Sequence, residues 1–275
     1  MTKKALELTP HQGEMLKPKE LIEVRNAGKF TLEDRRVYNA LVEKAWGPKL
    51  GDAKHKFEVP TGELRPLVGD NQRLKDTLRT LMTTLIEVDD GDNWKATQLL
   101  GTAELTTNNN SGVVRFTFPP MVVDLLKDST IFAKLDLEVM RSFRSKYAFS
   151  LYEAIARRAN MRRFTENLTM EDLRNILGVE AGKLDVYKNL NKYAIQPAIV
   201  EVNAQSPYTV SIGPVKKGRK VVSFIMGWET KSEEQLKAAY QEMQRHSAGR
   251  KARASGTTEH VNTEVDVLEN DREQP

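Results

Sequence analysis

The sequence predicts an α+β protein made of two tandem winged-helix domains, because the same order of elements occurs twice along its 275 residues. Each half contains a helix, a short second helix, a longer third helix and then a β-hairpin, which together form the winged-helix variant of the helix-turn-helix. The hydrophobic fraction of 39% suits ordinary soluble cores. We expect a flexible N-terminus at 1–19, domains at 20–135 and 136–230, and a C-terminal helix with a disordered tail at 231–275.

The first half begins with a capped helix. Thr31 followed by Asp34 resembles a capping box, apolar residues then recur at helical spacing, and Gly47 and Pro48 end the helix. The other elements expected in this half are a strand at 55–60, a short helix capped by Thr61, a helix at 71–88, a hairpin on either side of the Asn-rich loop 106–112, and a short helix at 121–127.

The second half repeats this order of elements. Helices are expected at 145–160 and, capped by Thr169, at 170–177. A longer helix at 186–203, the expected recognition helix, contains Pro197, which removes one backbone hydrogen bond and should bend it. The hairpin that follows, the expected wing, has apolar strands on either side of GPVKKGRK. A last helix, with Ser232 and Gln235 as a capping box, precedes residues 247–275, which we expect to be disordered.

The wing carries four cations at its tip, and these wing cations are Lys216, Lys217, Arg219 and Lys220. Gly218 lies between them and can supply the positive φ of a tight turn. The apolar strands can pack on the helices while the tip meets phosphates. The alternative is a solvated turn that discourages edge pairing. The position directly after a recognition helix favours DNA.

The expected recognition helix has an apolar and a polar side. Its outward residues are Lys188, Asn189, Lys192 and Gln196. Asn and Gln can pair with adenine, and lysine can reach guanine acceptors or phosphate. A plain solvated face is the alternative, and the sequence does not separate base contacts from phosphate contacts.

Weaker candidates for DNA contact lie elsewhere. Arg73, Lys75 and Arg79 project from the helix at 71–88, although Asp76 on the same face would repel phosphate. A solvated face is an equally good interpretation there. Lys146, at the start of the helix 145–160, completes the set of candidate DNA-binding residues.

No catalytic or metal-binding motif is present. The chain has no cysteine, its four histidines are scattered, and it lacks a phosphate-binding GxxxxGK[ST] loop. Four tyrosines fall at core-like helical positions and are poor nucleophiles: Tyr147, Tyr152, Tyr187 and Tyr193. We therefore expect a binding protein without enzymatic activity, cofactor or metal.

Charge and hydropathy indicate which partners and which cellular compartment to expect. The net charge is +4, and the last stretch of the chain is acidic, so the remainder is more basic than the average. Mild basicity is a weak indication of nucleic acid. No apolar run is long enough to span a bilayer, and no secretory signal is visible at the N-terminus. We expect a cytoplasmic protein with no membrane partner.

Several motifs together resemble one family. LKPKELIEV at 16–24 and the following LEDRRVYNALVEKA resemble the opening of replication initiator proteins of iteron-containing bacterial plasmids. SKYAFSLYEAIARR is similar to a helix of that family, and the segment from LTMEDLRNILGV to KKGRKVVSF is similar to its second winged helix and wing. The resemblance covers about 16–230, in matching order and spacing.

The resemblance implies a function. Monomers of such initiators bind direct repeats, the iterons, in double-stranded DNA at the origin and promote its melting. Dimers bind an inverted repeat and repress the initiator's own gene. The second domain supplies the main DNA contacts, and the first supplies accessory contacts and the dimer interface. The resemblance also implies self-association and, as partners, the host initiator, replicative helicase and chaperone. It places the recognition helix at 186–203 and the wing at 208–226. The chain departs from the family in having only Lys188 and Lys192 early in this helix, and we take Lys192 as the strongest single candidate for base contact.

Two other functions remain open at this stage. A winged-helix repressor without an origin role would use the same DNA-binding surface. A scaffold protein would use its winged helices to bind protein partners, and alanine substitution of the cations would then leave DNA affinity unchanged. We further expect the balance of monomer and dimer to switch an initiator between replication and repression.

Overall fold

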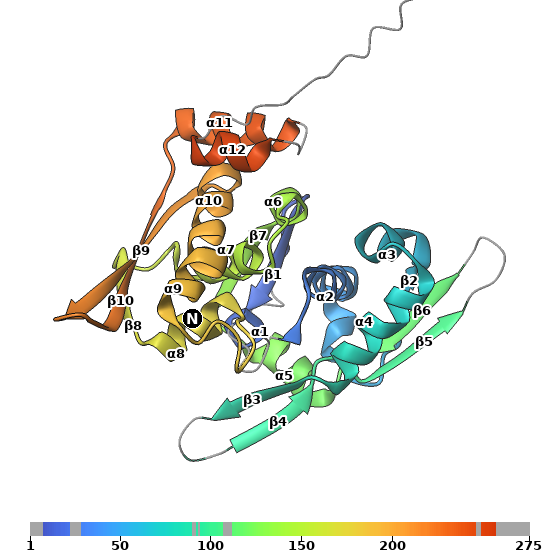
Figure 1. Ribbon diagram of the computed structural model, residues 1–275. Coiled ribbons are helices and arrows are strands. Elements are labelled where there is room, and N and C mark those ends of the chain that lie inside the picture. The colour runs from blue at the N-terminus through green and yellow to red at the C-terminus, as the bar shows by residue number, and fades with distance from the viewer. Residues whose placement is uncertain are drawn as a thin grey trace, which may run out of the picture.

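The computed structural model describes residues 8–22, 29–89, 92, 94–106, 112–245 and 249–256. Two helix-and-hairpin units lie side by side, with a small two-stranded sheet between them (Figure 1). The expected loop at 106–112 lies largely outside the described residues, as does the acidic end at 257–275. A single hydrophobic core extends from Met15 to Trp228 and passes through both units. The expected domain boundary at 135–136 therefore stays a prediction.

The first unit follows the expected order with one hairpin added. Thr31 forms the predicted capping box with Asp34, and the first helix ends where predicted, just before Gly47. The elements are α2 (Leu32–Ala45), η3 (Pro48–Gly51), β2 (Phe57–Pro60), α3 (Thr61–Val68), α4 (Asn71–Thr83), β3 (Leu85–Asp89), β4 (Trp94–Gln98), β5 (Thr102–Thr106) and β6 (Val113–Thr117).

Two local predictions in this unit are wrong. The helix expected at 71–88 ends at Thr83, and Leu85–Asp89 forms β3, paired with β4. The LIEVD run alternates: Ile86 is buried whereas Leu85 is half exposed, so a strand satisfies it better than another helical turn. Thr61 does not cap α3, because Pro60 is the N-cap. The Thr61 hydroxyl instead donates to the Gly112 carbonyl oxygen at 3.1 Å.

The N-terminus contains a strand that we did not predict. β1 (Glu14–Pro18) pairs with β7 (Phe132–Asp136), in register from Glu14 opposite Asp136. Met15 and Leu16 are buried in it, so these residues contradict the expected flexible segment 1–19. Only two apolar side chains mark the strand, and its partner lies far along the chain, so no local pattern reveals it. α1 (Lys19–Ile22) follows β1, and α5 (Pro120–Asp128) covers the expected helix at 121–127.

The second unit matches its predicted order. Thr169 caps this helix as predicted, and together with Asp172 it forms a capping box that we did not predict. Gly178 ends the helix in a left-handed conformation. The elements are α6 (Leu137–Ser142), α7 (Lys146–Arg158), β8 (Thr165–Leu168), α8 (Met170–Leu177), α9 (Tyr187–Leu190), η4 (Asn191–Ile195), α10 (Gln196–Gln205), β9 (Tyr208–Lys217) and β10 (Lys220–Thr230).

The two units share one sheet topology. In the first unit the sheet order is β2–β6–β5, and in the second it is β8–β10–β9. In each case the strand before the helix-turn-helix pairs antiparallel with the last strand of the hairpin. This arrangement confirms two winged-helix units, with the β3–β4 hairpin as an insertion in the first.

The recognition helix is a continuous run of α9, η4 and α10, and its middle is a π-turn. Pro197 has no N–H, and its ring would clash with the carbonyl oxygen four residues earlier in a regular α-helix. The wider π-turn at Asn191–Ile195 lies directly before it. The proline thus coincides with a local widening of the helix.

The C-terminal part is more ordered than predicted. α11 (Glu233–Gln244) begins with the predicted capping box of Ser232 and Gln235. α12 (Arg250–Ser255) contradicts the expected disorder over those residues. The Arg250 guanidinium donates to the carbonyl oxygen of Met243 at 3.1 Å and to Gln205 Oε1 at 3.2 Å, so it ties α12 to α11 and to the end of the recognition helix.

A buried ion pair joins the two units. Lys17 Nζ of β1 lies 2.7 Å from Glu153 Oε1 of α7, with both side chains at most 5% exposed. Asn39 of α2 donates to the same carboxylate oxygen at 2.9 Å. Burial lowers the pKa of Lys17, and the neighbouring Glu153 carboxylate opposes that effect. Elements from both units therefore meet at a single carboxylate.

Candidate nucleic-acid interface

The recognition helix is positioned by its neighbours on two sides. α10 packs against α7, and the Glu201 carboxylate accepts hydrogen bonds from the amides of Arg144 and Ser145 at 3.1 and 3.2 Å. Burial raises the pKa of Glu201, and these two amide donors oppose the rise. At the C-terminal end of the helix, Lys231 Nζ donates to the carbonyl oxygens of Asn203 and Ser206, which a helix leaves without partners.

The helix divides into the two faces that the sequence predicts. The inward side chains are completely buried, and they are Leu190, Ala194, Ala198 and Val202. The outward side chains are exposed, and they are Lys188, Asn189, Lys192 and Gln196. Gln196 Nε2 also donates to Asn191 Oδ1 at 3.3 Å. The geometry leaves this outward face accessible to a partner, and its contact with DNA stays a prediction.

Two apolar side chains on this helix are exposed, and sequence reasoning missed them. Tyr193 was expected in the core, but 53% of it is exposed. Tyr193 lies inside the π-turn and follows the outward-facing Lys192. The Lys192 ammonium lies 5.1 Å from the Tyr193 ring centre, a cation–π distance. Val186, the N-cap, is 62% exposed.

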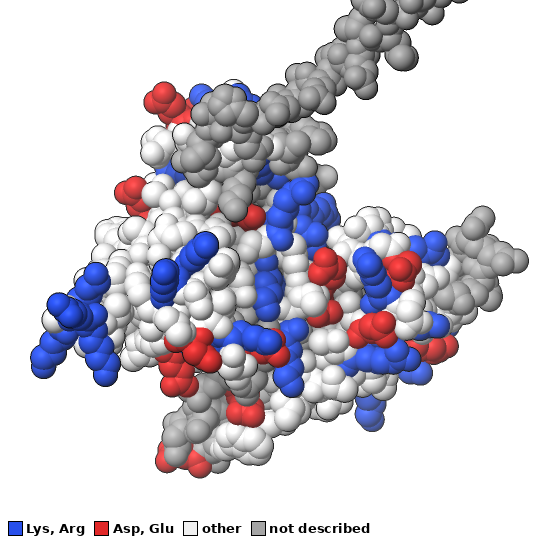
Figure 2. Space-filling view, in the orientation of Figure 1, with Lys and Arg blue, Asp and Glu red and all other residues white. Residues whose placement is uncertain are grey.

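The wing projects away from the helices, at the left of Figure 1. Lys217 pairs with Lys220 across a two-residue turn, and Gly218 supplies a φ of 63° at its first position. All four wing cations are exposed. Figure 2 shows basic side chains gathered at this tip. In the described part of the chain, no wing cation has an ion-pair partner within 4.0 Å.

Two of the three candidate cations of the first unit lie next to acids. Arg79 Nη1 lies 2.7 Å from Asp76 Oδ1, and Arg73 Nε lies 4.0 Å from Asp70 Oδ2. Lys75 is exposed on the same helix. Arg79 is therefore paired with the acid that the sequence marked as unfavourable for phosphate binding.

Lys146 lies in a different environment from the other candidates. It is the first residue of α7 and is only partly exposed, with its ammonium 5.4 Å from the Tyr147 ring centre. Burial lowers the pKa of Lys146, and the nearby Arg35 guanidinium lowers it further. Its charged neighbours Arg35 and Asp34 belong to α2, so Lys146 lies at the junction of the two units.

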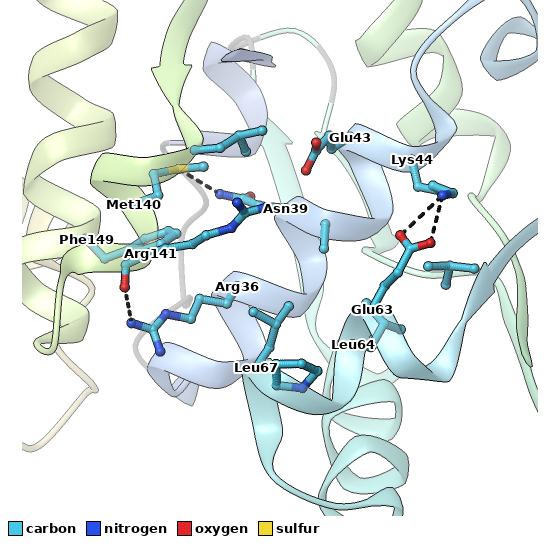
Figure 3. Close-up of a pocket in the computed structure, with 14 residues that line it drawn as sticks. Arg36, Asn39, Glu43, Lys44, Glu63, Leu64, Leu67, Met140, Arg141 and Phe149 are labelled. Atoms are coloured by element: carbon cyan, nitrogen blue, oxygen red, sulfur yellow. Dashed lines mark hydrogen bonds and ion pairs between the residues drawn. The ribbon is translucent and has the colours of Figure 1, made fainter. Parts of the chain in front are cut away.

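The junction also contains a groove of about 660 Å³ between α2, α3 and α6 (Figure 3). Arg36 donates to the carbonyl oxygens of Arg141, in the last turn of α6, and of Phe143, its C-cap, at 3.0 and 2.5 Å. Lys44 and Glu63 form an exposed ion pair of 3.1 Å along the groove. These contacts join neighbouring elements to each other, and none of the candidate DNA-contact residues lines the groove.

The described residues contain no group of three or more His, Cys, Asp or Glu that could hold a metal ion. Within the same ranges, no helix has the length and apolar character needed to cross a membrane.

Comparison with known proteins identifies the family. Among solved structures, the chain is similar to the Pi initiator protein in complex with iteron DNA, with a TM-score of 0.58 and 15% sequence identity over 82% of this chain and 100% of that one. No curated protein sequence matches this chain. Residues 14–156 match the family model for the first winged helix of initiator replication proteins, and 169–228 match the model for the second. The chain therefore belongs to the initiator replication protein family with two winged-helix domains.

Proposed function

We propose that this protein is a plasmid replication initiator that binds iteron repeats in double-stranded DNA in a sequence-specific manner. The observation that carries the proposal is the unpaired cationic tip of a wing that directly follows an exposed recognition helix. Family membership supports it, and so does the similar fold of the Pi initiator, which was solved with iteron DNA.

In this proposal the second unit makes the main contacts. The recognition helix enters the major groove, where Lys188, Asn189, Lys192 and Gln196 face base edges and phosphates. The wing cations reach over the adjacent backbone, and each phosphate that they neutralise releases counterions. Lys and Arg of both units are visible on one face in Figure 2, so the first unit can add contacts along the same DNA.

The regulatory part of the proposal extends further. A monomer bound to iterons would promote melting and loading of the host replisome, together with the host initiator, helicase and chaperone. A dimer bound to an inverted repeat would repress the initiator's own promoter. Membership of the family motivates this part. Sedimentation of the protein on both kinds of site tests it, since one fixed oligomeric state on both would contradict the switch.

A footprint of the purified protein on DNA flanking its own gene tests the proposal. We expect protection of evenly spaced direct repeats, on one face of the double helix at each repeat. Protection of a single inverted repeat over the promoter would instead identify a repressor without an origin role. Absence of protection, together with unchanged DNA affinity after alanine substitution of the wing cations, would support a protein-binding scaffold.

A further inference from the structure

One arginine side chain holds the turn between α8 and α9. Arg174, in the last turn of α8, donates from Nη1 to the carbonyl oxygen of Leu184 at 3.0 Å. Its Nη2 donates to the carbonyl oxygens of Glu180 at 3.1 Å and Lys183 at 2.6 Å. The same nitrogen lies 3.2 Å from Asp185 Oδ1, and the Arg174 side chain is only 16% exposed. A single guanidinium thus contacts several of the residues that precede the recognition helix.

The backbone of this turn is strained, so contacts such as those from Arg174 are needed to hold its conformation. Leu184 has a φ of 53°, and among the described residues it is the one non-glycine with a positive φ. The left-handed conformation brings the Cβ of an L-residue close to the next carbonyl oxygen, so leucine adopts it only when its surroundings impose it. Leu184 also packs against the core, which favours an apolar side chain at this position. The bond from Arg174 to the Leu184 carbonyl is one of the contacts that impose this conformation.

The start of the recognition helix depends on this turn. Its N-cap, Val186, makes no side-chain capping hydrogen bond. The first backbone bonds run from the amides of Asn189 and Leu190 to the Val186 carbonyl oxygen, at 2.9 and 3.0 Å. In a helix-turn-helix, the N-terminal residues of the recognition helix contact base edges. The direction of the residues that include Lys188 and Asn189 is therefore set by the segment 180–185.

We propose that Arg174 is a positioning residue for DNA recognition: its guanidinium holds residues 180–185 in the conformation that aims the first turn of the recognition helix. The planar fork of arginine suits this task, because it can reach several carbonyl oxygens at once, whereas a lysine ammonium is a point charge on a flexible stem. The inference rests on the proposed function. Arg174 acts through the helix and is not assigned a contact with DNA.

Arg174→Ala and Arg174→Lys test this role on two duplexes, the footprinted site and a scrambled duplex of the same length. We expect affinity for the site to fall by about tenfold or more, comparable to the loss of one good base contact. Affinity for the scrambled duplex should change by less than about twofold, because the wing cations that dominate non-specific binding are intact. Arg174→Lys should recover little of the loss. Equal fold-losses on both duplexes, which leave the ratio of the two affinities unchanged, would overturn the proposal.

A second substitution separates positioning from general loss of folding. Glycine adopts positive φ without a Cβ clash, so Leu184→Gly in the Arg174→Ala background should restore part of the site preference. If Arg174 only stabilised the fold, removing the Leu184 side chain as well would lower site affinity further. Failure to restore any preference would therefore contradict the positioning role.

Amide hydrogen exchange gives a measurement that does not depend on DNA. In Arg174→Ala, the amides of Asn189 and Leu190 should exchange faster, while amides in the α7 core should keep their rates. Unchanged exchange at the two amides would overturn the positioning role even if the wild-type protein prefers no DNA sequence. A wild-type protein without site preference but with faster exchange in the variant would refute the proposed function alone.

Discussion

The two winged-helix units have the same topology but different charge balance. In the first, the candidate DNA-facing helix carries Arg79 paired with Asp76, and Arg115 in the sheet lies 2.6 Å from Glu58 and 3.6 Å from Glu104. In the second, the recognition helix and wing tip expose cations that have no acidic partner within 4.0 Å among the described residues. One fold thus presents a partly neutralised surface in one copy and an unneutralised one in the other.

This difference assigns the units different roles in the proposed function. An arginine that is already paired with a carboxylate must lose or share that partner before it gains a phosphate, so its net contribution is small. Unpaired lysines on a wing tip release counterions with no such cost. We therefore expect the second unit to dominate the salt dependence of binding, and the first to contribute mainly by position.

The largest expected effect concerns the junction that holds both units. Lys17→Met removes the ammonium that lies 2.7 Å from the buried Glu153 carboxylate, which then keeps the hydrogen bond from Asn39 and the more distant charge of Arg35. We expect the free energy of unfolding, measured by urea denaturation, to fall by about 3–5 kcal/mol. The double variant Lys17→Met/Glu153→Gln should recover part of this loss. A decrease below about 1 kcal/mol for the single variant would show that the pair does not join the units.

The next effect separates the units by charge. Alanine at all four wing cations should make the slope of log K against log salt concentration less negative by up to about 3.6, since each phosphate contact contributes roughly 0.9. The matched variant carries alanine at Arg73, Lys75 and Arg79, and its slope should change by no more than about 1. Affinities measured between 50 and 200 mM salt, a range of about fourfold, check both values. Equal slope changes would remove the distinction between the units.

A smaller effect sharpens the same comparison. Asp76→Asn removes the charge that pairs with Arg79 while keeping a side chain of the same shape. We expect DNA affinity to rise by about 0.2–1 kcal/mol, the usual range for an exposed ion pair. Both side chains are exposed, so stability should hardly change. A lower affinity for DNA would mean that Asp76 itself supports the interface.

Features fixed by neighbouring residues could be predicted from the sequence. The helix starts at Thr31, Thr169 and Ser232 depend on hydrogen bonds within four residues. All three caps are confirmed, and so are the capping boxes predicted at Thr31 and Ser232. The wing turn follows from Gly218 between strands of alternating burial. Periodicity also separated the buried from the exposed face of the recognition helix, with the exception of Tyr193.

Features fixed by distant partners could not be predicted. β1 needs β7, and α12 depends on Arg250 reaching the end of the recognition helix. The π-turn before Pro197 was not predicted either, and Tyr193, which was placed in the core, lies exposed within it. The role proposed for Arg174 depends on carbonyl oxygens up to ten residues away. Every residue has a backbone carbonyl, so the sequence does not indicate which of them a side chain contacts.

The central claim is that the recognition helix reads base pairs while the wing holds phosphates. The most direct test compares wild type and Lys192→Ala on a panel of single base-pair variants of the footprinted site. Lys192 is exposed, so the substitution should leave the fold intact. We predict a loss of about 1–3 kcal/mol on the natural site, with discrimination abolished at one or two base pairs and kept at the others. A uniform loss across the whole panel would contradict the claim and place Lys192 on the phosphate backbone.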